Sequence, residues 1–304
     1  MQKKEEVIRQ IEESKELHFA PSAKEYFGIS LKKVRAIAQD KGIPVKEIEI
    51  AALEKGIIPL RYQRNIGTIG LKGQIKLLRS TVAVVGAGGL GGGAIELLAR
   101  QGIGHIVIID SDCFTEENLN RQLMSTEKSL GKYKAIIAAK RVKKINSAVT
   151  VTPGIKKITP ENAHNLIKKA QVVVDGLDDL PSRFVVEKAA RDLGIPFIYG
   201  AIAGFSGQLM TIFSKDAGLS SIFGPPGDLS VQGVELEMGN PSATPAMVMA
   251  WQVQEVIKII TGVGKPLRNR LLWFDGEEGT TGVIELEKTG NPGRKKEVKE
   301  VKDK

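Results

Sequence analysis

Cysteine is nearly absent from this chain. One thiol, Cys113, occurs among 304 residues, so no disulfide can form within the chain. A single thiol also leaves too few ligands for a structural zinc site built from four cysteines. We therefore expect the protein to hold no zinc.

Long apolar runs are also absent. The sequence contains no stretch of about 18 apolar residues, the length at which a membrane-spanning helix becomes a candidate. The first residues, MQKKEEVIRQIEES, are charged throughout and lack the apolar core of a secretory signal. We expect no membrane association and, by default, a cytoplasmic location.

The net charge is +9, but no single basic surface accounts for it. Residues 288–304 carry seven Lys/Arg against three Asp/Glu, a charge of +4, and residues 1–56 carry eleven against ten, a charge of +1.

Apolar periodicity within residues 1–58 predicts a helical appendage of three short helices, which could form a helix-turn-helix. Because phosphate contact dominates nucleic-acid affinity, the near-neutral charge makes DNA an improbable partner. Residues 289–304 are expected to form a charged, disordered tail.

The most informative segment begins at Thr81. The run TVAVV predicts a buried strand, the turn Gly86-Ala87-Gly88-Gly89-Leu90-Gly91 follows, a periodic helix reaches about Arg100, and the strand HIVIID ends at Asp110. This order is the fingerprint of a dinucleotide-binding fold. Gly86 permits the tight turn, Gly88 lets backbone N–H groups approach a phosphate, and Gly91 lets the helix pack against the strand.

The residues after Asp110 favour a triphosphate over NAD. A second acid, Asp112, follows, and then Arg121 and Lys134 come within one short segment. A dehydrogenase needs one acid for the ribose and then a hydride-transfer centre. Two cations beside a phosphate-binding turn instead suit a triphosphate, whose charge they can neutralise.

Five motifs together carry a family resemblance: GAGGLG, DSD, NLNRQ, GKYK and DGLDD. They resemble the superfamily of ubiquitin-activating enzymes in its small bacterial form, the sulfur-carrier adenylyltransferases of molybdopterin and thiamine-thiazole synthesis. The resemblance implies an α/β domain over residues 59–288, Rossmann-like and doubly wound, with a mainly parallel sheet and antiparallel C-terminal strands. It also implies ATP- and Mg²⁺-dependent adenylation of the C-terminal carboxylate of a ubiquitin-like sulfur-carrier protein.

The resemblance also implies roles for particular residues. Asp110 would take the ribose hydroxyls, and Arg121 and Lys134 would bind the phosphates. Asp178 would hold Mg²⁺, although its place before a helix would also suit a capping residue. The remaining nucleotide contacts would come from the turn and from nearby polar and apolar residues: Gly86, Gly88, Gly89, Gly91, Asp112, Asn118, Gln122 and Leu177.

A cation before the glycine turn implies a dimer. In the segment RYQR, residues 61–64, the family resemblance implies that Arg64 reaches the nucleotide bound by a second copy of the chain. That arrangement would make the protein a homodimer with shared active sites, each completed by an arginine in trans.

The sequence departs from the family pattern in its thiols. Many small members carry two CxxC pairs that bind zinc, but residues 220–223 and the residues after Asn291-Pro292-Gly293 contain no cysteine. Many members also carry a reactive thiol in the loop that corresponds to residues 216–242, which contains none here. Cys113 lies in another segment and is interpreted as a packing residue. Adenylation is therefore expected, whereas a thioester or persulfide step on the enzyme is not.

Other functions remain open at this point. The same chemistry could activate another carboxylate, such as one on a modified tRNA base. A chain of this fold could instead be an NAD-binding oxidoreductase or a nucleotide-sensing scaffold. Arg121 and Lys134 weaken the NAD hypothesis, and the full set of ATP-site matches weakens the scaffold hypothesis.

Overall fold

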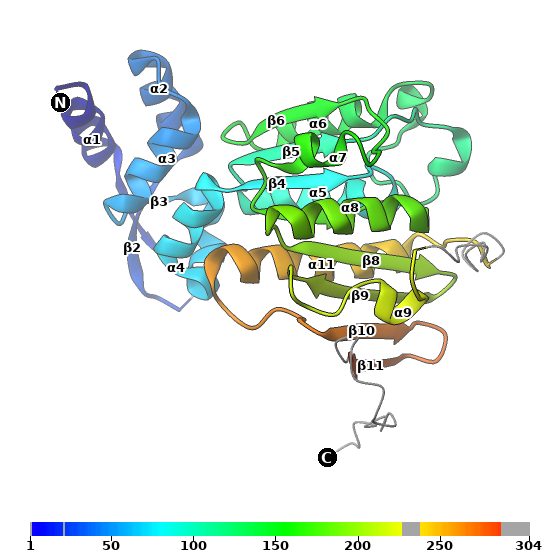
Figure 1. The fold of residues 1–304 in the computed structure, drawn as a ribbon. Coiled ribbons are helices and arrows are strands. Elements are labelled where there is room, and N and C mark those ends of the chain that lie inside the picture. Colours follow the sequence, from blue (N-terminus) through cyan, green and yellow to red (C-terminus); the bar gives the residue numbers. More distant parts are fainter. Residues whose placement is uncertain (1, 21, 227–237, 287–304) are drawn as a thin grey trace.

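An eight-stranded mixed sheet organises the larger part of the chain (Figure 1). The computed structural model describes residues 2–20, 22–226 and 238–286, and the strand order is β11-β10-β9-β8-β7-β4-β5-β6. The parallel strands are β4 (Thr81–Val85), β5 (His105–Ile109), β6 (Thr150–Gly154), β7 (Val172–Asp175) and β8 (Phe197–Ala203). The antiparallel strands are β9 (Ser206–Ile212), β10 (Arg270–Asp275) and β11 (Thr280–Glu285). This architecture confirms the predicted fold class.

The central strand β4 fixes where a ligand can bind. It pairs with β5 on one side and β7 on the other, and the register places Val85 opposite both Ile109 and Asp175. The residues that follow these three therefore meet at one edge of the sheet. Because the strand order reverses beside β4, this edge opens the crevice in which open α/β sheets bind ligands.

Helices cover both faces of the sheet. Val82 and Val84 pack into one apolar core with side chains of α4 (Gln63–Arg79), α5 (Gly89–Gln101), α6 (Lys134–Ile145) and α11 (Ala243–Thr261). Ala83 and Val85 point to the opposite face and pack with α7 (Ala163–Ile167) and α8 (Leu180–Leu193). The apolar run TVAVV is thus buried on both faces, as expected for a central parallel strand.

The N-terminal appendage contains more than helices. It consists of α1 (Gln2–Ser14), β1 (Glu16–Phe19), β2 (Glu25–Ile29), α2 (Leu31–Lys41), α3 (Val45–Glu54) and β3 (Ile58–Pro59). The three predicted helices are present, but the prediction of a helical appendage is incomplete, because β1, β2 and β3 form a small sheet. Each of these strands is too short to be stable alone, so pairing decides its conformation.

A buried polar junction joins the appendage to the larger domain. Glu49 of α3 is fully buried and lies 3.2 Å from the guanidinium of Arg61. The Tyr62 hydroxyl donates a hydrogen bond of 3.1 Å to Glu49 and accepts one from Asn146, which precedes β6. Both these polar contacts and apolar packing therefore hold the appendage against the residues at the start of α4.

Shorter helical turns complete the described chain. These are 3₁₀ turns at Leu60–Tyr62, Glu116–Asn118 and Glu127–Ser129, and the one-turn helix α9 (Ser220–Phe223). The predicted tail from residue 289 lies outside the described residues, as do residues 227–237 of the predicted loop. Within the described ranges no helix is long and apolar enough to cross a membrane.

The glycine turn makes a testable demand on packing. A Cβ added at Gly91 would lie 1.9 Å from the carbonyl oxygen of Gly86, whereas one at Gly93 would meet the flexible sulfur end of Met249. We expect Gly91→Ala to lower the free energy of unfolding by about 1–3 kcal/mol or more, because backbone cannot move aside. Gly93→Ala should cost less, since the Met249 side chain can rotate. Equal losses in chemical denaturation would contradict this account.

Candidate active site

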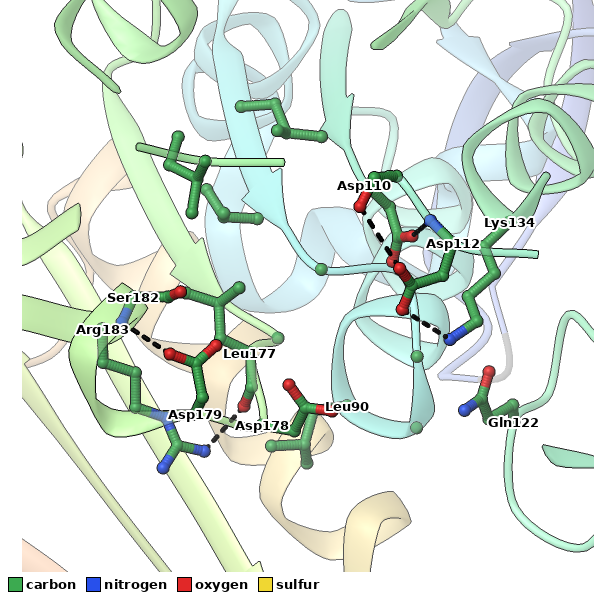
Figure 2. Close-up of a pocket in the computed structure, with 18 of the residues that line it drawn as sticks. Leu90, Asp110, Asp112, Gln122, Lys134, Leu177, Asp178, Asp179, Ser182 and Arg183 are labelled. Atoms are coloured by element: carbon green, nitrogen blue, oxygen red, sulfur yellow. Dashed lines mark hydrogen bonds and ion pairs between the residues drawn. The ribbon is translucent and has the colours of Figure 1, made fainter. Parts of the chain in front are cut away.

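A cavity of about 330 Å³ lies at the carboxyl ends of β4, β5 and β7 (Figure 2). Figure 2 shows Asp178 and Arg183 on one side of the start of α5, and Asp112 with Lys134 on the other. The predicted site residues that line this cavity are Gly86, Gly88, Gly89, Asp110, Asp112, Arg121, Gln122, Lys134, Leu177 and Asp178. The structure thus brings together segments that lie up to about ninety positions apart in the sequence.

The glycine turn approaches the backbone of the next turn closely. Gly86 has φ of +90°, and a Cβ there would lie 2.2 Å from the carbonyl oxygen of Gly176. Helix α5 then begins at Gly89, so the free N–H groups of its first turn lie at the cavity. Such a terminus attracts phosphate through its amides and its partial positive charge. The prediction that Gly86 permits a tight turn is confirmed.

Asp110 both lines the cavity and supports the glycine turn. Its Oδ2 accepts a hydrogen bond of 2.7 Å from the N–H of Ala87, and its Oδ1 accepts one of 2.7 Å from the N–H of Asp112. Burial raises the pKa of this carboxyl above its ordinary value, and the two backbone hydrogen bonds oppose that shift. The supporting role was not anticipated from the sequence. The ribose contact stays a prediction.

Two predicted cations lie beside the turn. Lys134 is the first residue of α6, and its Nζ lies 3.4 Å from Oδ2 of Asp112. The guanidinium of Arg121 donates hydrogen bonds of 2.8 Å to the carbonyl of Glu117 and to the side chain of Asn120. Both cations are therefore held by protein groups close to the first turn of α5, where the phosphates of a nucleotide would lie.

Neighbouring acids on the opposite side of the cavity have different roles. Asp179 is the N-cap of α8, and its Oδ1 accepts a hydrogen bond of 2.7 Å from the N–H of Ser182. The alternative interpretation of Asp178 as the cap is therefore wrong. Asp178 is exposed and lines the cavity, which leaves its carboxylate available to a cation.

Three predicted residues do not line the cavity. Gly91 packs against Gly86, and Asn118 is buried with its side-chain oxygen accepting a hydrogen bond of 3.1 Å from the N–H of Thr115. Arg64 is exposed near the start of α4, the helix that leads into the first residue of β4. That helix lies beside the appendage, at the end of the sheet opposite the cavity (Figure 1). Arg64 therefore does not reach the nucleotide site of its own chain.

Several cavity residues were not predicted. Lys156 and Lys157 lie on the loop after β6, and Asn240 comes from the segment before α11. Arg183 of α8 also lines the cavity and forms a buried ion pair with Asp175, the last residue of β7. The sequence offered one sign of this ion pair, because Asp175 is the first acid of the motif DGLDD. That Asp175 is buried could not be predicted from the motif.

The mixture of charges fits a nucleotide bound with a metal ion. Cations from α6, α8 and two loops line the cavity together with acids from the ends of β5 and β7. Cations alone would suit a bare phosphate. Exposed carboxylates beside them suit a divalent ion, because Mg²⁺ in phosphate sites is commonly held by one or two carboxylates and by phosphate oxygens.

Residues 62–295 match the ThiF family. The matched region contains the whole cavity and more than half of the chain. The chain belongs to the ThiF family. Membership of this family implies that the chain uses ATP.

Curated relatives agree on the activity. The chain is 35% identical over 232 residues to the SAMP-activating enzyme E1 of Haloferax volcanii, covering 74% of this chain and 84% of that protein. It is 34% identical over 230 residues to the sulfur carrier protein adenylyltransferase of Thermus thermophilus, covering 72% and 84%. It is 32% identical over 241 residues to the adenylyltransferase and sulfurtransferase MOCS3 of Arabidopsis thaliana, covering 77% and 52%. This chain is an adenylyltransferase.

Solved structures share the fold. Escherichia coli MccB with ATP aligns with a TM-score of 0.65 at 22% identity, over 83% of this chain and 82% of that one. The microcin C7 biosynthetic enzyme MccB in complex with N-formylated MccA aligns with a TM-score of 0.65 at 20% identity, over 92% and 87%. At these identities the likeness establishes the common architecture.

Cys113 gives a test of which groups take part in the reaction. It is partly exposed, forms a backbone bridge with Tyr133 and does not line the cavity. We expect Cys113→Ser and Cys113→Ala to keep ATP–pyrophosphate exchange within about twofold of the unmodified protein, because attack of the substrate on the α-phosphate of ATP needs no enzyme thiol. Loss of exchange in both variants, with ATP binding retained, would show that the thiol takes part.

Proposed function

We propose that this chain catalyses Mg²⁺-dependent adenylation of the C-terminal carboxylate of a small ubiquitin-like sulfur-carrier protein. The reaction would serve sulfur transfer for molybdopterin or tungstopterin synthesis, or for thiamine synthesis, in the cytoplasm. The observation that carries the proposal is that Asp178 and Lys134 lie on opposite sides of one glycine turn (Figure 2), in a cavity that Arg121 also lines. Relatives named for a sulfur carrier and for SAMP activation support a protein substrate.

The proposed reaction requires two anions to meet. A carboxylate oxygen of the carrier attacks the α-phosphorus of ATP, the bond to the β-phosphate oxygen breaks, and pyrophosphate leaves with its electron pair. The products are an acyl-adenylate and pyrophosphate. Because the substrate is itself the nucleophile, the enzyme supplies position and charge stabilisation and no nucleophile of its own.

Each side of the cavity has a proposed task. Amides of the glycine turn, Arg121 and Lys134 hold the phosphates and stabilise the charge that builds on the leaving pyrophosphate. Asp110 and Asp112 lie where the ribose would follow, and Gln122 orients the phosphates. Asp178 would hold Mg²⁺, and the ion would supply stabilisation of the negative charge on the phosphates. The proposed enzyme contains no zinc.

A carrier-dependence experiment tests the substrate. Purified carrier proteins with a free C-terminal carboxylate should support ATP–pyrophosphate exchange, whereas the same carriers with an amidated C-terminus should not. Exchange driven instead by tRNA that bears a carboxylate on a modified base would favour the alternative substrate. NAD binding without any exchange would contradict the proposal.

Variants on the two sides of the cavity test the site. We expect Asp178→Ala and Lys134→Ala each to lower exchange by about 10²-fold or more, because each loses charge stabilisation at the transferring phosphate. Lys132→Ala, in the same GKYK motif, and Asp192→Ala, on α8, change exposed residues outside the cavity and should stay near normal. Near-normal exchange in the first two variants would remove them from the site.

Arg64 is proposed to act across a dimer interface. Among the described residues it has no hydrogen-bond or ion-pair partner, whereas Arg61 of the same motif is occupied by Glu49. The exposed guanidinium is thus available to a nucleotide bound by a second copy. Two-fold symmetry would then supply one such arginine to each site, as an arginine finger does in trans.

Mixing two inactive chains tests the shared site. Arg64→Ala and Asp178→Ala homodimers should each be nearly inactive, while a mixed dimer has one site with both residues intact. After random subunit exchange, activity should return to about one quarter of normal, because half of the dimers are mixed and each has one good site. Lys72→Ala, another exposed cation on α4, should be active alone. No recovery despite confirmed subunit exchange would contradict action in trans.

A further inference from the structure

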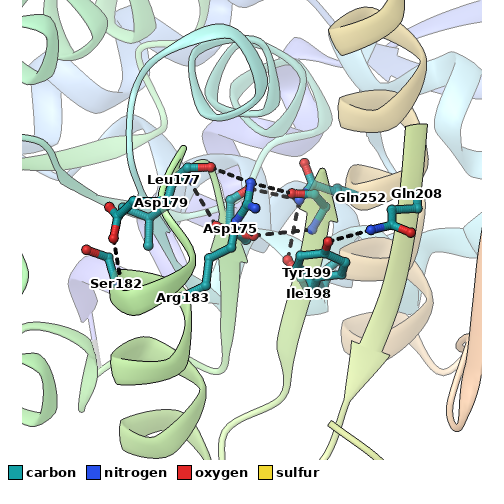
Figure 3. Close-up of polar contacts among 10 residues, drawn as sticks. Asp175, Leu177, Asp179, Ser182, Arg183, Ile198, Tyr199, Gln208 and Gln252 are labelled. Carbon is teal, nitrogen blue, oxygen red and sulfur yellow. Dashed lines mark hydrogen bonds and ion pairs between the residues drawn. The ribbon is translucent and has the colours of Figure 1, made fainter. Parts of the chain in front are cut away.

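A buried ion pair lies directly beneath the turn that carries Asp178 (Figure 3). Asp175 is fully buried, and its Oδ2 lies 3.2 Å from Nε of Arg183, whose side chain is 5% exposed. Withdrawing two charges from water is costly, so a buried pair is weak evidence for stability. Since stability does not account for this pair, we ask which neighbouring groups it holds in position.

Both members of the pair bind the backbone of Leu177. Oδ1 of Asp175 accepts a hydrogen bond of 3.0 Å from the Leu177 N–H, and Nη2 of Arg183 donates one of 2.7 Å to the Leu177 carbonyl. The carbonyl belongs to the peptide group that joins Leu177 to Asp178. Because a peptide group is planar, fixing that carbonyl also fixes the orientation of the chain entering Asp178.

The pair is itself held in place from behind. The side-chain amide of Gln252 donates hydrogen bonds of 2.8 Å to the carbonyl of Asp175 and 3.3 Å to that of Ile198. The guanidinium of Arg183 lies 5.4 Å from the ring centroid of Tyr199, whose hydroxyl accepts a hydrogen bond of 2.8 Å from Gln208. Helix α11 and strands β8 and β9 thus support one turn, as Figure 3 shows.

The glycine turn limits the same segment on its other side. The N–H of Gly176 donates a hydrogen bond of 2.7 Å to the carbonyl of Val85, and the carbonyl of Gly176 occupies the space that a Cβ of Gly86 would need. The turn at residues 176–179 is therefore fixed relative to the phosphate-binding turn. Among the described residues, the carboxylate of Asp178 forms no hydrogen bond or ion pair, so its direction depends on the backbone that carries it.

We propose that Asp175 and Arg183 are positioning residues that aim the carboxylate of Asp178 at the metal ion of the bound nucleotide. The inference rests on the proposed role of Asp178. Mg²⁺ requires near-ideal octahedral geometry with ligands at about 2.0–2.1 Å, so a rotated carboxylate loses the ion more readily than it loses the nucleotide. Neither residue of the pair needs to contact the reacting atoms.

Magnesium titration distinguishes positioning from general support. Arg183→Gln removes the donor to Leu177, and we expect the half-saturating Mg²⁺ concentration for ATP–pyrophosphate exchange to rise on the order of tenfold. Affinity for ATP measured without metal should stay within about twofold. Exchange should recover in part at high Mg²⁺, because excess ion repopulates the misaligned site.

Arg191→Gln is the matched control on the same helix. Arg191 forms an ion pair of 2.8 Å with Glu187 and donates to loop carbonyls, away from the turn at residues 176–179. We expect this variant to lower thermal stability while leaving the Mg²⁺ dependence unchanged. If Arg183→Gln fails to fold, Arg183→Lys keeps the charge but not the planar fork, and should raise the half-saturating Mg²⁺ concentration by a smaller factor.

The outcomes separate this inference from the proposed function. An unchanged Mg²⁺ dependence in a folded Arg183 variant, with Asp178→Ala still inactive, would overturn the positioning role alone. Normal exchange and normal Mg²⁺ dependence in Asp178→Ala would instead refute the proposed role of Asp178. In the Asp178→Ala background, Arg183→Gln should cause no further loss of exchange, and an additional loss of tenfold or more would also overturn the inference.

Discussion

The close approach of backbones at the carboxyl end of the central strand β4 is the constraint on which the rest of the site depends. A side chain at Gly86 would collide with the carbonyl of Gly176, and one at Gly91 would collide with the carbonyl of Gly86. The turn at Gly86, the turn at Gly176 and the start of α5 therefore pack so closely that only glycine, which has no Cβ, fits at Gly86 and Gly91. This packing sets the separation between the backbone amides of the glycine turn on one side and the exposed Asp178 on the other.

The charges around this centre are arranged by burial. Asp110 and Asp175, at the ends of the two strands that flank β4, are buried, and their oxygens accept hydrogen bonds from the backbone N–H groups of Ala87, Asp112 and Leu177. Burial raises the pKa of Asp175 to about 6, although the guanidinium of Arg183 favours its charged form. Asp178, in contrast, is exposed and lines the cavity. The acids that support the backbone thus differ from Asp178 in exposure and in hydrogen bonding.

The appendage and the proposed shared site meet at one short segment. Within RYQR, Arg61 and Tyr62 are bound to the buried Glu49 of the appendage, and Arg64 is the second residue of α4. The appendage therefore fixes the direction in which this helix starts. Its small sheet leaves Leu17, Phe19 and Phe27 exposed, a feature that no part of the adenylation chemistry explains.

The sequence by itself determined the sheet class and the glycine turn, and most of the residues predicted for the site do line the cavity. These follow from local rules: strand periodicity, the conformational freedom of glycine, and motifs whose members are close together in the chain. The ends of α2 and α11 follow a local rule of the same kind, because each helix stops at a glycine, Gly42 or Gly262, that adopts a positive φ.

Tertiary structure decided what each acid does. Asp175, Asp178 and Asp179 look alike in the motif DGLDD, but β7 buries the first, the turn exposes the second, and α8 uses the third as its cap. Three other features could not be predicted from the sequence: the strands of the appendage, the ion pair of Arg183 with Asp175, and the burial of Asn118 outside the cavity. Each depends on groups that are distant in the chain or on burial, and burial is a property of the folded whole.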